Sequence, residues 1–392
     1  MKCLSLLLVI LEVLSSSIAR EHFQKGYNEF TADVYKKMLA INSGNFIVCP
    51  LSVDIVLALA ESGARGKTAK EMKSVLRLPK NRKRIHKIFR NITPCLDSNE
   101  PYTLKSANKI YLTDKYVIND HFKNISVTVF NSELETVDFV DNEKSANKIN
   151  QWVKEQTNGK IKDIINAGAL DDHTFAVLVN AIYFHGKWSN GFDKRYTSQS
   201  IFHLNSKDEI ETNMMNATSD YSFFWSKELE AQFLKLEYIG DDVSMHIVLP
   251  DDWEGLAALE EKISDVLVPP EYETTRVNVR IPKFKMETKI PFKSILKKMG
   301  IKIAFIKGIA DFQGMVDNDI KGYISEVTQK AFIEVDEEGT TAAAVTTVEV
   351  GGFKSISDLG KLKLFHANHP FLFYLRLDKL GVNLFVGRFI SP

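Results

Sequence analysis

The sequence has few cysteines, glycines and prolines and no excess of either charge. Its 50 Lys and Arg balance 50 Asp and Glu, and only 20 Gly and 11 Pro occur among 392 residues. Zero net charge argues against a globally basic nucleic-acid-binding protein and against a disordered charged chain, and the low Gly and Pro content excludes collagen-like and linker-like sequence. Beyond the amino terminus, no apolar run approaches the roughly 18 residues that cross a bilayer. We expect a globular protein that binds neither nucleic acid nor membrane.

The first nineteen residues have the arrangement of a secretory signal. Lys2 precedes an apolar run over 4–11, and the small residues 17–19 suit signal peptidase. We therefore expect residues 1–19 to be a signal peptide cleaved after Ala19, and the mature protein, 20–392, to be secreted into the extracellular space. Glu12 fits a signal peptide poorly, and an uncleaved anchor is the alternative.

Cleavage would also remove Cys3 and leave only Cys49 and Cys95. Two cysteines cannot form a disulfide framework in a chain of this length. Cys49 follows the apolar run 46–48, so we expect a small buried side chain there, with a Cys49–Cys95 bridge as the alternative. Glycosylation sequons that fit export occur at Asn91, Asn124 and Asn216, the first weakened by the Pro94 that follows it.

Helical periodicity dominates the first half of the chain, and strand periodicity dominates the second. Apolar residues recur every three or four positions over 23–38, which predicts a helix, and Thr68 with Glu71 indicates a capping box. Alternating apolar residues predict strands at 243–249 and 277–281, and further strands are expected at 371–375 and 382–386. Because helices and strands are segregated and no Pro/Gly/Ser-rich linker divides the chain, we expect one α+β domain.

The sequence offers no consistent enzyme or metal motif. Gly63 to Thr68 is similar to a phosphate-binding loop, but it has two residues between its glycines where that loop needs four. The string Ser-Ala-Asn-Lys-Ile occurs at 106–110 and at 145–149, which we interpret as coincidence because the flanks are unlike. His366 and His369 have no carboxylate or thiol ligand nearby. We expect no catalytic activity, no metal and no cofactor.

The segment after Asp336 has the composition of a strand rather than of a surface loop. Residues 340–348 are all small or β-branched, with no charge, Pro or Gly. With a period of two, Thr340, Ala342 and Ala344 share one face that could enter a sheet interior. A resident core strand is the alternative interpretation, although such a strand rarely ends in a run such as 351–355, Gly-Gly-Phe-Lys-Ser.

This segment and several others resemble the serpin family. Glu337 to Ala344 is similar to the hinge of an inhibitory reactive-centre loop, and Asn180 to Trp188 is similar to the family's central strand motif. The resemblance extends from about residue 24 to residue 390. Further matches lie at 63–68, 281–284, 310–315, 365–371 and 385–389.

The resemblance implies an α+β serpin fold with three β-sheets, including a large five-stranded sheet A, about nine helices, and an exposed reactive-centre loop at about 337–362. It implies a secreted inhibitor that acts as a suicide substrate of chymotrypsin-like or trypsin-like serine proteases. Cleavage of the loop would free the hinge, which would insert as a strand and trap the acyl-enzyme. The implied hinge residues are Glu337, Glu338, Gly339, Thr340, Thr341, Ala342, Ala343 and Ala344.

The resemblance leaves two alternatives open. The chain could inhibit cysteine proteases by the same mechanism, or it could be a non-inhibitory serpin that acts as carrier, storage protein or chaperone. We expect a monomer whose partner is a target extracellular protease held in a covalent complex.

Family spacing places the scissile bond sixteen residues after Glu337, between Phe353 and Lys354. Phenylalanine at this position suits chymotrypsin-like pockets. A shift by one residue gives the bond between Lys354 and Ser355, which suits a trypsin-like pocket with an acidic floor. We favour Phe353, and both bonds could be used.

Three further sets of residues follow from the resemblance. At the shutter, where the sheet parts, the family has two serines, an asparagine and a histidine, and the matching residues here are Cys49, Ser52, Asn180 and Gln329. Trp188 is expected to cover the top of the sheet, where the hinge enters. A predicted helix carries the basic residues Lys80, Arg82, Lys83, Arg84, Lys87 and Arg90. The matching helix of some serpins binds heparin, so glycosaminoglycan activation is one interpretation and a solvated basic face is the other.

Overall fold

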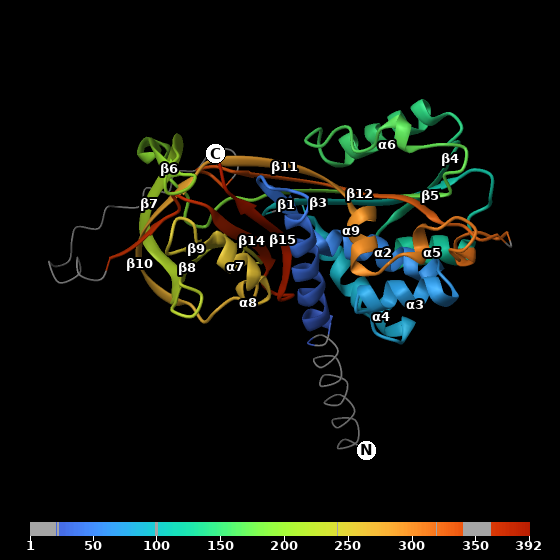
Figure 1. Ribbon diagram of the computed structural model, residues 1–392, viewed down its shortest axis with the longest axis horizontal. Helices are drawn as coiled ribbons and strands as arrows, with labels where there is room; N and C mark the ends of the chain where they lie inside the picture. Colours follow the sequence, from blue (N-terminus) through green and yellow to red (C-terminus); the bar gives the residue numbers. More distant parts are fainter. Residues whose placement is uncertain (1–20, 22, 99–100, 241, 319, 340–361) are drawn as a thin grey trace, which may run out of the picture.

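The computed structural model describes residues 21, 23–98, 101–240, 242–318, 320–339 and 362–392. The expected signal peptide, hinge residues 340–344 and both candidate scissile bonds lie outside the described residues. The described chain forms two β-sheets with helices packed against them (Figure 1), which confirms the expected α+β class.

The first sheet has six strands, in the order β11-β12-β5-β3-β2, with β4 also paired to β3. Its central strands β5 and β12 are parallel neighbours. β5 is buried at every residue except its last, which explains why its sequence, apart from Asn180 and the terminal His185, is apolar rather than alternating. The strand bounds are β2 Asp97–Ser98, β3 Thr103–Thr113, β4 Glu133–Val137, β5 Ala176–His185, β11 Phe284–Pro291 and β12 Ile324–Val335.

The second sheet has nine strands, in the order β1-β15-β14-β9-β8-β7-β10-β13, with β6 also paired to β7. All four predicted strands belong to this sheet. The ranges predicted at 243–249, 277–281, 371–375 and 382–386 lie in β9, β10, β14 and β15, respectively. The bounds are β1 Phe46–Val48, β6 Ser198–His203, β7 Glu209–Ser226, β8 Ala231–Glu237, β9 Val243–Pro250, β10 Glu273–Pro282, β13 Lys363–His366, β14 Phe371–Leu377 and β15 Val382–Phe389.

The described strands group differently from the three sheets that the resemblance implied. β7 is 18 residues long, and along its length it pairs with β6, β10 and β8. Because this one long strand pairs with all three, strands that would otherwise form two separate sheets belong to a single hydrogen-bonded sheet. The expected five-stranded sheet becomes six-stranded because the two-residue strand β2 pairs with one end of β3.

Nine α-helices occur in the part of the chain that the structure describes, as expected. The first covers residues 23–39, where the apolar periodicity predicted it. The others are α2 Pro50–Gly63, α3 Gly66–Val75, α4 Arg82–Ile92, α5 Asp120–Thr128, α6 Asn142–Gln156, α7 Leu256–Glu261, α8 Ile263–Val266 and α9 Phe292–Met299. None of these described helices is long and apolar enough to cross a bilayer.

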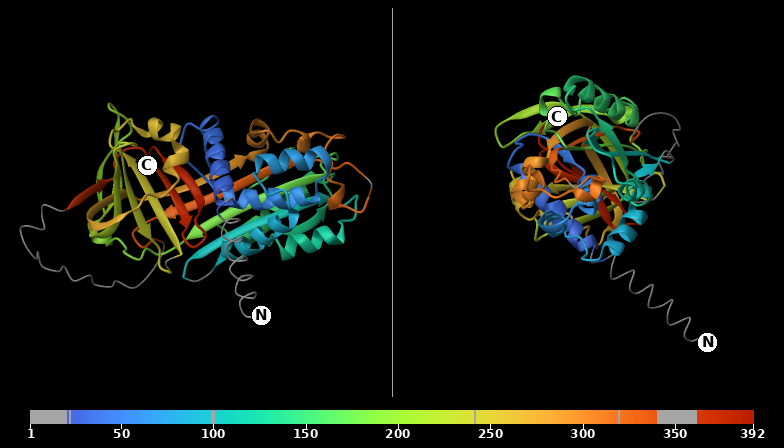
Figure 2. Two further views of the ribbon diagram at one scale, coloured as in Figure 1. Left: turned by 90° about the horizontal axis from the view of Figure 1, so that it is seen from below. Right: turned by 90° about the vertical axis from the view of Figure 1, so that its right-hand side faces the viewer.

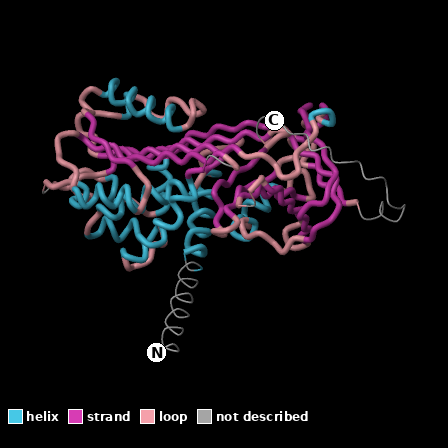
Figure 3. Tube along the Cα trace, turned by 180° about the vertical axis from the view of Figure 1, so that it is seen from behind, coloured by secondary structure: helices cyan, strands magenta, loops and turns pink. Residues whose placement is uncertain are grey.

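Most helices gather at one end of the molecule and the nine-stranded sheet lies at the other, where α7 and α8 pack beside β9 (Figures 1 and 3). At the helical end, α2, α3, α4, α5 and α9 lie on one face of the six-stranded sheet and α6 lies on the opposite face (Figures 1 and 2). The main apolar core fills the space on the α2 side. A smaller apolar cluster, which includes Ile149 and Val153, packs α6 against the sheet.

The predicted capping box at Thr68 and Glu71 is wrong. α3 already begins at Gly66, so both residues lie inside the helix. Thr68 Oγ1 instead accepts a hydrogen bond from the Asp311 amide, and the Glu71 carboxylate accepts from the amides of Lys302 and Ile303. The Thr68 and Glu71 side chains therefore bind distant backbone amides instead of capping the first turn of the helix, as the local sequence had predicted.

Candidate functional site

The line between β5 and β12, which we call the seam, is the place where the six-stranded sheet could accept another strand. The two strands pair directly from Ala176 and Ile324 to Phe184 and Ile333. This direct pairing means that no strand occupies the seam. An entering strand would have to replace these hydrogen bonds with two new ladders, one on each side.

A row of polar side chains crosses the seam near its middle. In register, Asn108 of β3 lies opposite Asn180 of β5, and Asn180 lies opposite Gln329 of β12. Gln329 Nε2 donates to Asn180 Oδ1, and Asn180 Nδ2 donates to Asn108 Oδ1. All three residues are buried. The amides therefore link three neighbouring strands in surroundings where an unpaired polar group is costly.

The amino-terminal end of α2 supports this row from the helical side. The Gln329 amide accepts from Cys49 N at 2.9 Å and donates to Cys49 O at 2.8 Å. Asn180 Nδ2 also donates to Ser52 Oγ. The four residues matched to the shutter, Cys49, Ser52, Asn180 and Gln329, thus lie together. Gln329 binds the backbone of Cys49, so the contact does not need the serine hydroxyl that the family has there.

Cys49 itself is a buried, unpaired thiol, and Cys95 is also free. Burial raises the pKa of the Cys49 thiol to about 12. The thiol is therefore neutral at physiological pH and acts as a small apolar side chain, as the sequence predicted.

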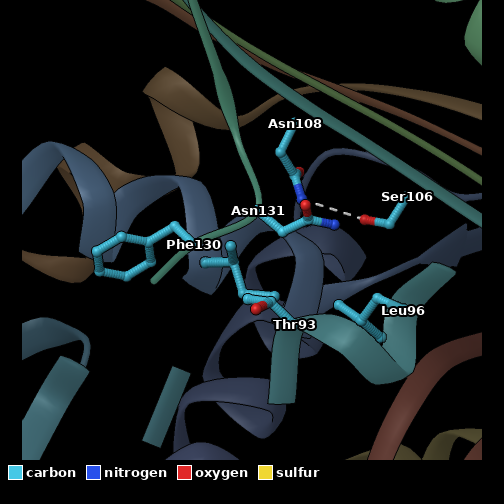
Figure 4. A pocket seen from close by; sticks show the side chains of 7 residues that line it. Thr93, Leu96, Ser106, Asn108, Phe130 and Asn131 are labelled. Atoms are coloured by element: carbon cyan, nitrogen blue, oxygen red, sulfur yellow. Dashed lines mark hydrogen bonds between the residues drawn. The ribbon is translucent and has the colours of Figure 1, made fainter. Parts of the chain in front are cut away.

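Two residues of the polar row were missed in the sequence. Ser106 and Asn108 alternate along β3, and Ser52 Oγ is 2.8 Å from Ser106 Oγ and 3.2 Å from Asn108 Oδ1. Figure 4 shows Ser106 and Asn108 at a small hollow that Thr93 also lines. The side chains around this hollow leave no volume for a ligand. Two small polar residues at a spacing of two, within the strand sequence TLKSANKIYLT, were the only signal, and the repeated string that contains them is easily interpreted as coincidence.

The hinge begins where β12 ends, at the upper end of the seam. The Trp188 amide donates to Glu338 O at 3.2 Å and the Phe192 amide donates to Glu337 O at 2.8 Å. Trp188 Nε1 donates to Asp336 O at 2.9 Å, and its ring stacks on Tyr238 with centroids 4.2 Å apart. Trp188 follows β5, so the described start of the hinge is fastened beside the strand next to which it would insert.

Two carboxylates of the hinge are held by charged partners. Glu337, which is 3% exposed, accepts from Thr197 Oγ1 at 2.8 Å and pairs with Lys283 Nζ at 2.7 Å. Burial would raise the pKa of the Glu337 carboxyl, but the hydrogen bonds from Lys283, from the backbone and from Thr197 outweigh burial and hold this pKa below its usual value. Glu338 pairs with Lys194 in a more exposed contact. Lys283 lies within a matched motif, but its role as a hinge partner was not predicted.

Glycine is required at position 339. Gly339 has a φ of 84°, and a Cβ there would lie 2.4 Å from Gly186 O and from Trp188 N. A side chain would both strain the backbone and push the hinge away from Trp188. Gly339 therefore allows the turn by which the chain leaves β12 close to β5.

Comparisons with known proteins identify the family and the fold. Residues 25–392 match the family model described as serpin, serine protease inhibitor. The chain belongs to the serpin family. It is 36% identical over 377 residues to antichymotrypsin-2 of Bombyx mori, covering 93% of this chain and 97% of that protein. It is 34% identical over 385 residues to the leukocyte elastase inhibitor of Homo sapiens, covering 95% and 100%.

Solved serpin structures have the same fold. The crystal structure of Serpin48 from the insect Tenebrio molitor superimposes with a TM-score of 0.86 at 36% identity, covering 95% of this chain and 98% of that one. The structure of cleaved Serpin 42Da gives a TM-score of 0.85 at 29% identity, covering 95% and 99%. The serpin fold predicted from the sequence motifs is confirmed.

The predicted basic cluster of this serpin lies on and just before α4, but its six side chains differ in their exposure to solvent. Lys80, which precedes α4, and Lys83, Arg84, Lys87 and Arg90 on α4 are exposed, whereas Ile85 and Phe89 of the helix are buried. Arg82 instead turns inward, where it pairs with the buried carboxylate of Glu61 and donates to Ala64 O. Burial, together with Arg82 and Arg90, lowers the pKa of His86 on the same helix. Five of the six predicted residues therefore form an exposed basic surface.

The three sequons lie in different surroundings. Asn91 on α4 and Asn124 on α5 are exposed. Asn216 lies half-buried in β7, and its Oδ1 accepts a hydrogen bond from Asn278 Nδ2 at 2.9 Å. An N-glycan would attach to Nδ2 of Asn216 and leave Oδ1 able to accept this hydrogen bond, so Asn216 differs from the two exposed sites in being half-buried.

Replacing Gln329 with Leu should destabilise the closed seam. The substitution leaves the buried N–H and C=O groups of Cys49 without their partner, which should lower the free energy of unfolding by about 2–4 kcal/mol. Urea unfolding measures the change. Gln199→Leu, at an exposed position of β6, is the matched control, and equal effects of the two substitutions would contradict the role of Gln329.

The Glu337 contact should make the hinge sensitive to acid. A carboxyl whose folded pKa is lowered contributes stability that is present above its unfolded pKa of about 4.3 and is lost as the pH falls through the folded pKa. We expect the unfolding temperature to fall between pH 5 and pH 3, roughly this window, more steeply in the wild type than in Glu337→Gln. Glu338→Gln, which removes the neighbouring half-buried carboxylate, should keep most of the wild-type slope. If Glu338→Gln flattens the slope instead, the assignment to Glu337 is wrong.

Proposed function

We propose that this serpin is a secreted inhibitor that acts as a suicide substrate of serine proteases. The observation that carries the proposal is the position of the hinge. Its described residues Glu337 to Gly339 are fastened to the chain that follows β5, at one end of a seam that is closed. A strand that continues from this hinge is placed to enter between β5 and β12 once the loop is cut.

The energy for trapping a protease comes from new ladder hydrogen bonds. Each inserted residue contributes roughly 1 kcal/mol net, so about ten residues supply on the order of 10 kcal/mol. The uncharged, small or β-branched composition of 340–348 suits this step, because bulky or charged inward residues would slow insertion and let the acyl-enzyme hydrolyse. The same composition argues against the alternative of a non-inhibitory carrier, storage protein or chaperone.

The target class follows from the bait residue. Phe353 would fit a chymotrypsin-like pocket, and one relative is named antichymotrypsin-2. Lys354 would fit a trypsin-like pocket.

The proposal of export rests on the signal-like residues 1–19 and on the exposed sequons at Asn91 and Asn124. A cysteine protease trapped by the same mechanism is the alternative target. The protein is proposed to act as a monomer. It is proposed to be cleaved by its target rather than to act as an enzyme.

Incubation with chymotrypsin, trypsin and papain should give a covalent complex that survives denaturant with at least one serine protease. The released carboxyl-terminal peptide should begin at Lys354 if Phe353 is the bait, and at Ser355 if Lys354 is. Phe353→Ala should slow complex formation with chymotrypsin at least about tenfold, because the apolar pocket is left unfilled.

Ala342→Arg is the control for the trapping step. It should still be cleaved, but it should yield free active protease because the inward arginine hinders insertion. No stable complex with any of the three proteases, together with no rise in unfolding temperature after loop cleavage, would rule out the inhibitory function.

We further propose that the exposed basic surface of α4 binds a glycosaminoglycan. Lys83, Lys87 and Arg90 recur at spacings of four and three, so they line one face of the helix. The triple substitution to Ala should weaken heparin binding by about tenfold or more at low salt, since each exposed contact contributes up to about 1 kcal/mol. Heparin chromatography in a salt gradient measures this loss. The matched triple Ala variant of Lys297, Lys298 and Lys302 should bind heparin as the wild type does. If this control variant lost more heparin affinity than the α4 variant, α4 would be excluded as the binding site.

A further inference from the structure

Two of the four tryptophans of the chain are exposed, and both lie on the nine-stranded sheet or beside it. Trp225, near the end of β7, is 50% exposed, and Trp253, in the turn between β9 and α7, is 43% exposed. The other two differ, because Trp188 is buried and Trp152 is half-buried. Tryptophan is the side chain most enriched at the energetic centres of protein interfaces. Two exposed tryptophans in one region therefore point to a partner.

The two exposed rings are held in fixed orientations by neighbouring side chains. Trp225 Nε1 donates to Asp251 Oδ2 at 2.8 Å. Trp253 stacks on His203 of β6, with ring centroids 3.8 Å apart and planes 9° apart. Asp251 and Trp253 are two residues apart, so their Cα atoms are separated by no more than about 7 Å. Both rings thus belong to one surface, and they lose little side-chain freedom when a partner covers them.

The hairpin formed by β6 and β7 continues this surface. Glu209 of β7 is opposite His203 in register, and its Oε2 lies 3.7 Å from His203 Nδ1. The turn that carries Trp253 reaches the same hairpin, because the Ser206 amide donates to Glu254 Oε1 at 3.1 Å. The hairpin and the turn are therefore joined by a ring contact and a hydrogen bond.

Exposed carboxylates accompany the rings along the whole surface. Within the described residues, none of the six carboxylates in this region pairs with a lysine or arginine, and Lys207 in the hairpin turn offsets at most one of their charges. A chain of zero net charge thus has a strongly negative region here. We use the name acidic aromatic surface for Trp225, Trp253 and these six carboxylates, Asp208, Glu209, Glu211, Asp251, Asp252 and Glu254.

An unsatisfied hydrogen-bond acceptor lies beside Trp225. Gln232 of β8 is directly opposite Trp225 in register, so the two side chains share a face of the sheet. Gln232 Oε1 is buried and has no hydrogen-bond donor in the part of the chain that the structure describes. An acceptor buried without a donor costs free energy. Ring faces, carboxylates and this carbonyl all attract the same kind of group, a positively charged N–H donor.

We propose that the acidic aromatic surface docks an extended segment of a partner protein that is rich in arginine and lysine. Arginine suits both parts of the surface, because a guanidinium stacks on an aromatic face and binds a carboxylate through two hydrogen bonds. β6, β7 and β8 lie at the end of the molecule away from α4 (Figure 1). The exposed basic surface of α4 and this acidic surface are thus separated, and their combined field orients an approaching basic partner toward the acidic end. Neither the hinge nor the seam takes part, so the proposal does not rest on protease inhibition.

Fluorescence anisotropy of a labelled octa-arginine peptide, mixed with the full secreted chain at low salt, tests this docking surface. The wild type should bind the peptide, and the affinity should fall as salt is added because exposed charges are screened. The double variant Trp225→Leu/Trp253→Leu keeps apolar side chains but removes the ring faces on which a guanidinium stacks. It should bind the peptide about tenfold more weakly.

Neutralising three carboxylates of the surface tests its charge. The triple variant Glu209→Gln/Glu211→Gln/Asp252→Asn should bind octa-arginine about tenfold more weakly or worse, since each exposed charge contact contributes up to about 1 kcal/mol, or about fivefold. The matched control neutralises three exposed carboxylates outside the surface, and it should bind as the wild type does. The control changes are Glu143→Gln, Glu155→Gln and Asp172→Asn. Equal weakening in the two triple variants would overturn the surface, because the attraction would then belong to the whole molecule.

Acrylamide quenching of the wild-type tryptophan fluorescence needs no substitution and tests the rings even if the leucine variant does not fold. Bound octa-arginine should protect the fluorescence from acrylamide, because it covers Trp225 and Trp253, and octa-glutamate should not. Binding without protection would overturn the role of the two rings.

A second copy of the chain, bound through its α4, is the other basic occupant that the charges allow. Analytical ultracentrifugation separates the two cases. A monomeric wild type that binds octa-arginine as described supports a separate basic partner. Oligomers of the wild type that disappear both in the triple variant of the surface and in the triple Ala variant of Lys83, Lys87 and Arg90 would overturn it, as would a wild type that does not bind octa-arginine.

Discussion

The direct pairing of β5 with β12 is the constraint on which the rest of the molecule depends. Nine residue pairs hold these parallel strands together from Ala176–Ile324 to Phe184–Ile333. A sheet closed in this way has no strand between β5 and β12, although residues 340–348 have the composition of a strand. Under the proposed function, the protein stores free energy only as long as the seam stays closed.

Different parts of the structure hold the seam at its middle and at its upper end. The amides of Asn180 and Gln329 join the two strands in the middle and are tied to α2 through the backbone of Cys49. At the upper end, Trp188 and Lys283 fasten the start of the hinge. Each set is local, which suits a sheet that, under the proposed function, stays closed until the loop is cut.

The two departures from the family's shutter pattern compensate for each other. Gln329 stands where the family has a histidine, and it bonds to the backbone N–H and C=O of Cys49 rather than to the Cys49 side chain. The cysteine then needs no hydroxyl, and its neutral thiol fills apolar space. Considered one at a time, these substitutions look like losses of hydrogen bonding, because the sequence does not show which atoms face each other.

The sequence by itself determined the family, the helix over 23–39, the predicted strands of the nine-stranded sheet and the strand-like character of 340–348, because these follow from local periodicity and contiguous motifs. It did not determine the roles of Ser106, Asn108 or Lys283, nor the true partners of Thr68 and Glu71. Those depend on which distant strands lie side by side and in what register. A register is set by the packing of the whole core, so only the tertiary structure could join Trp225 to Asp251 and stack Trp253 on His203.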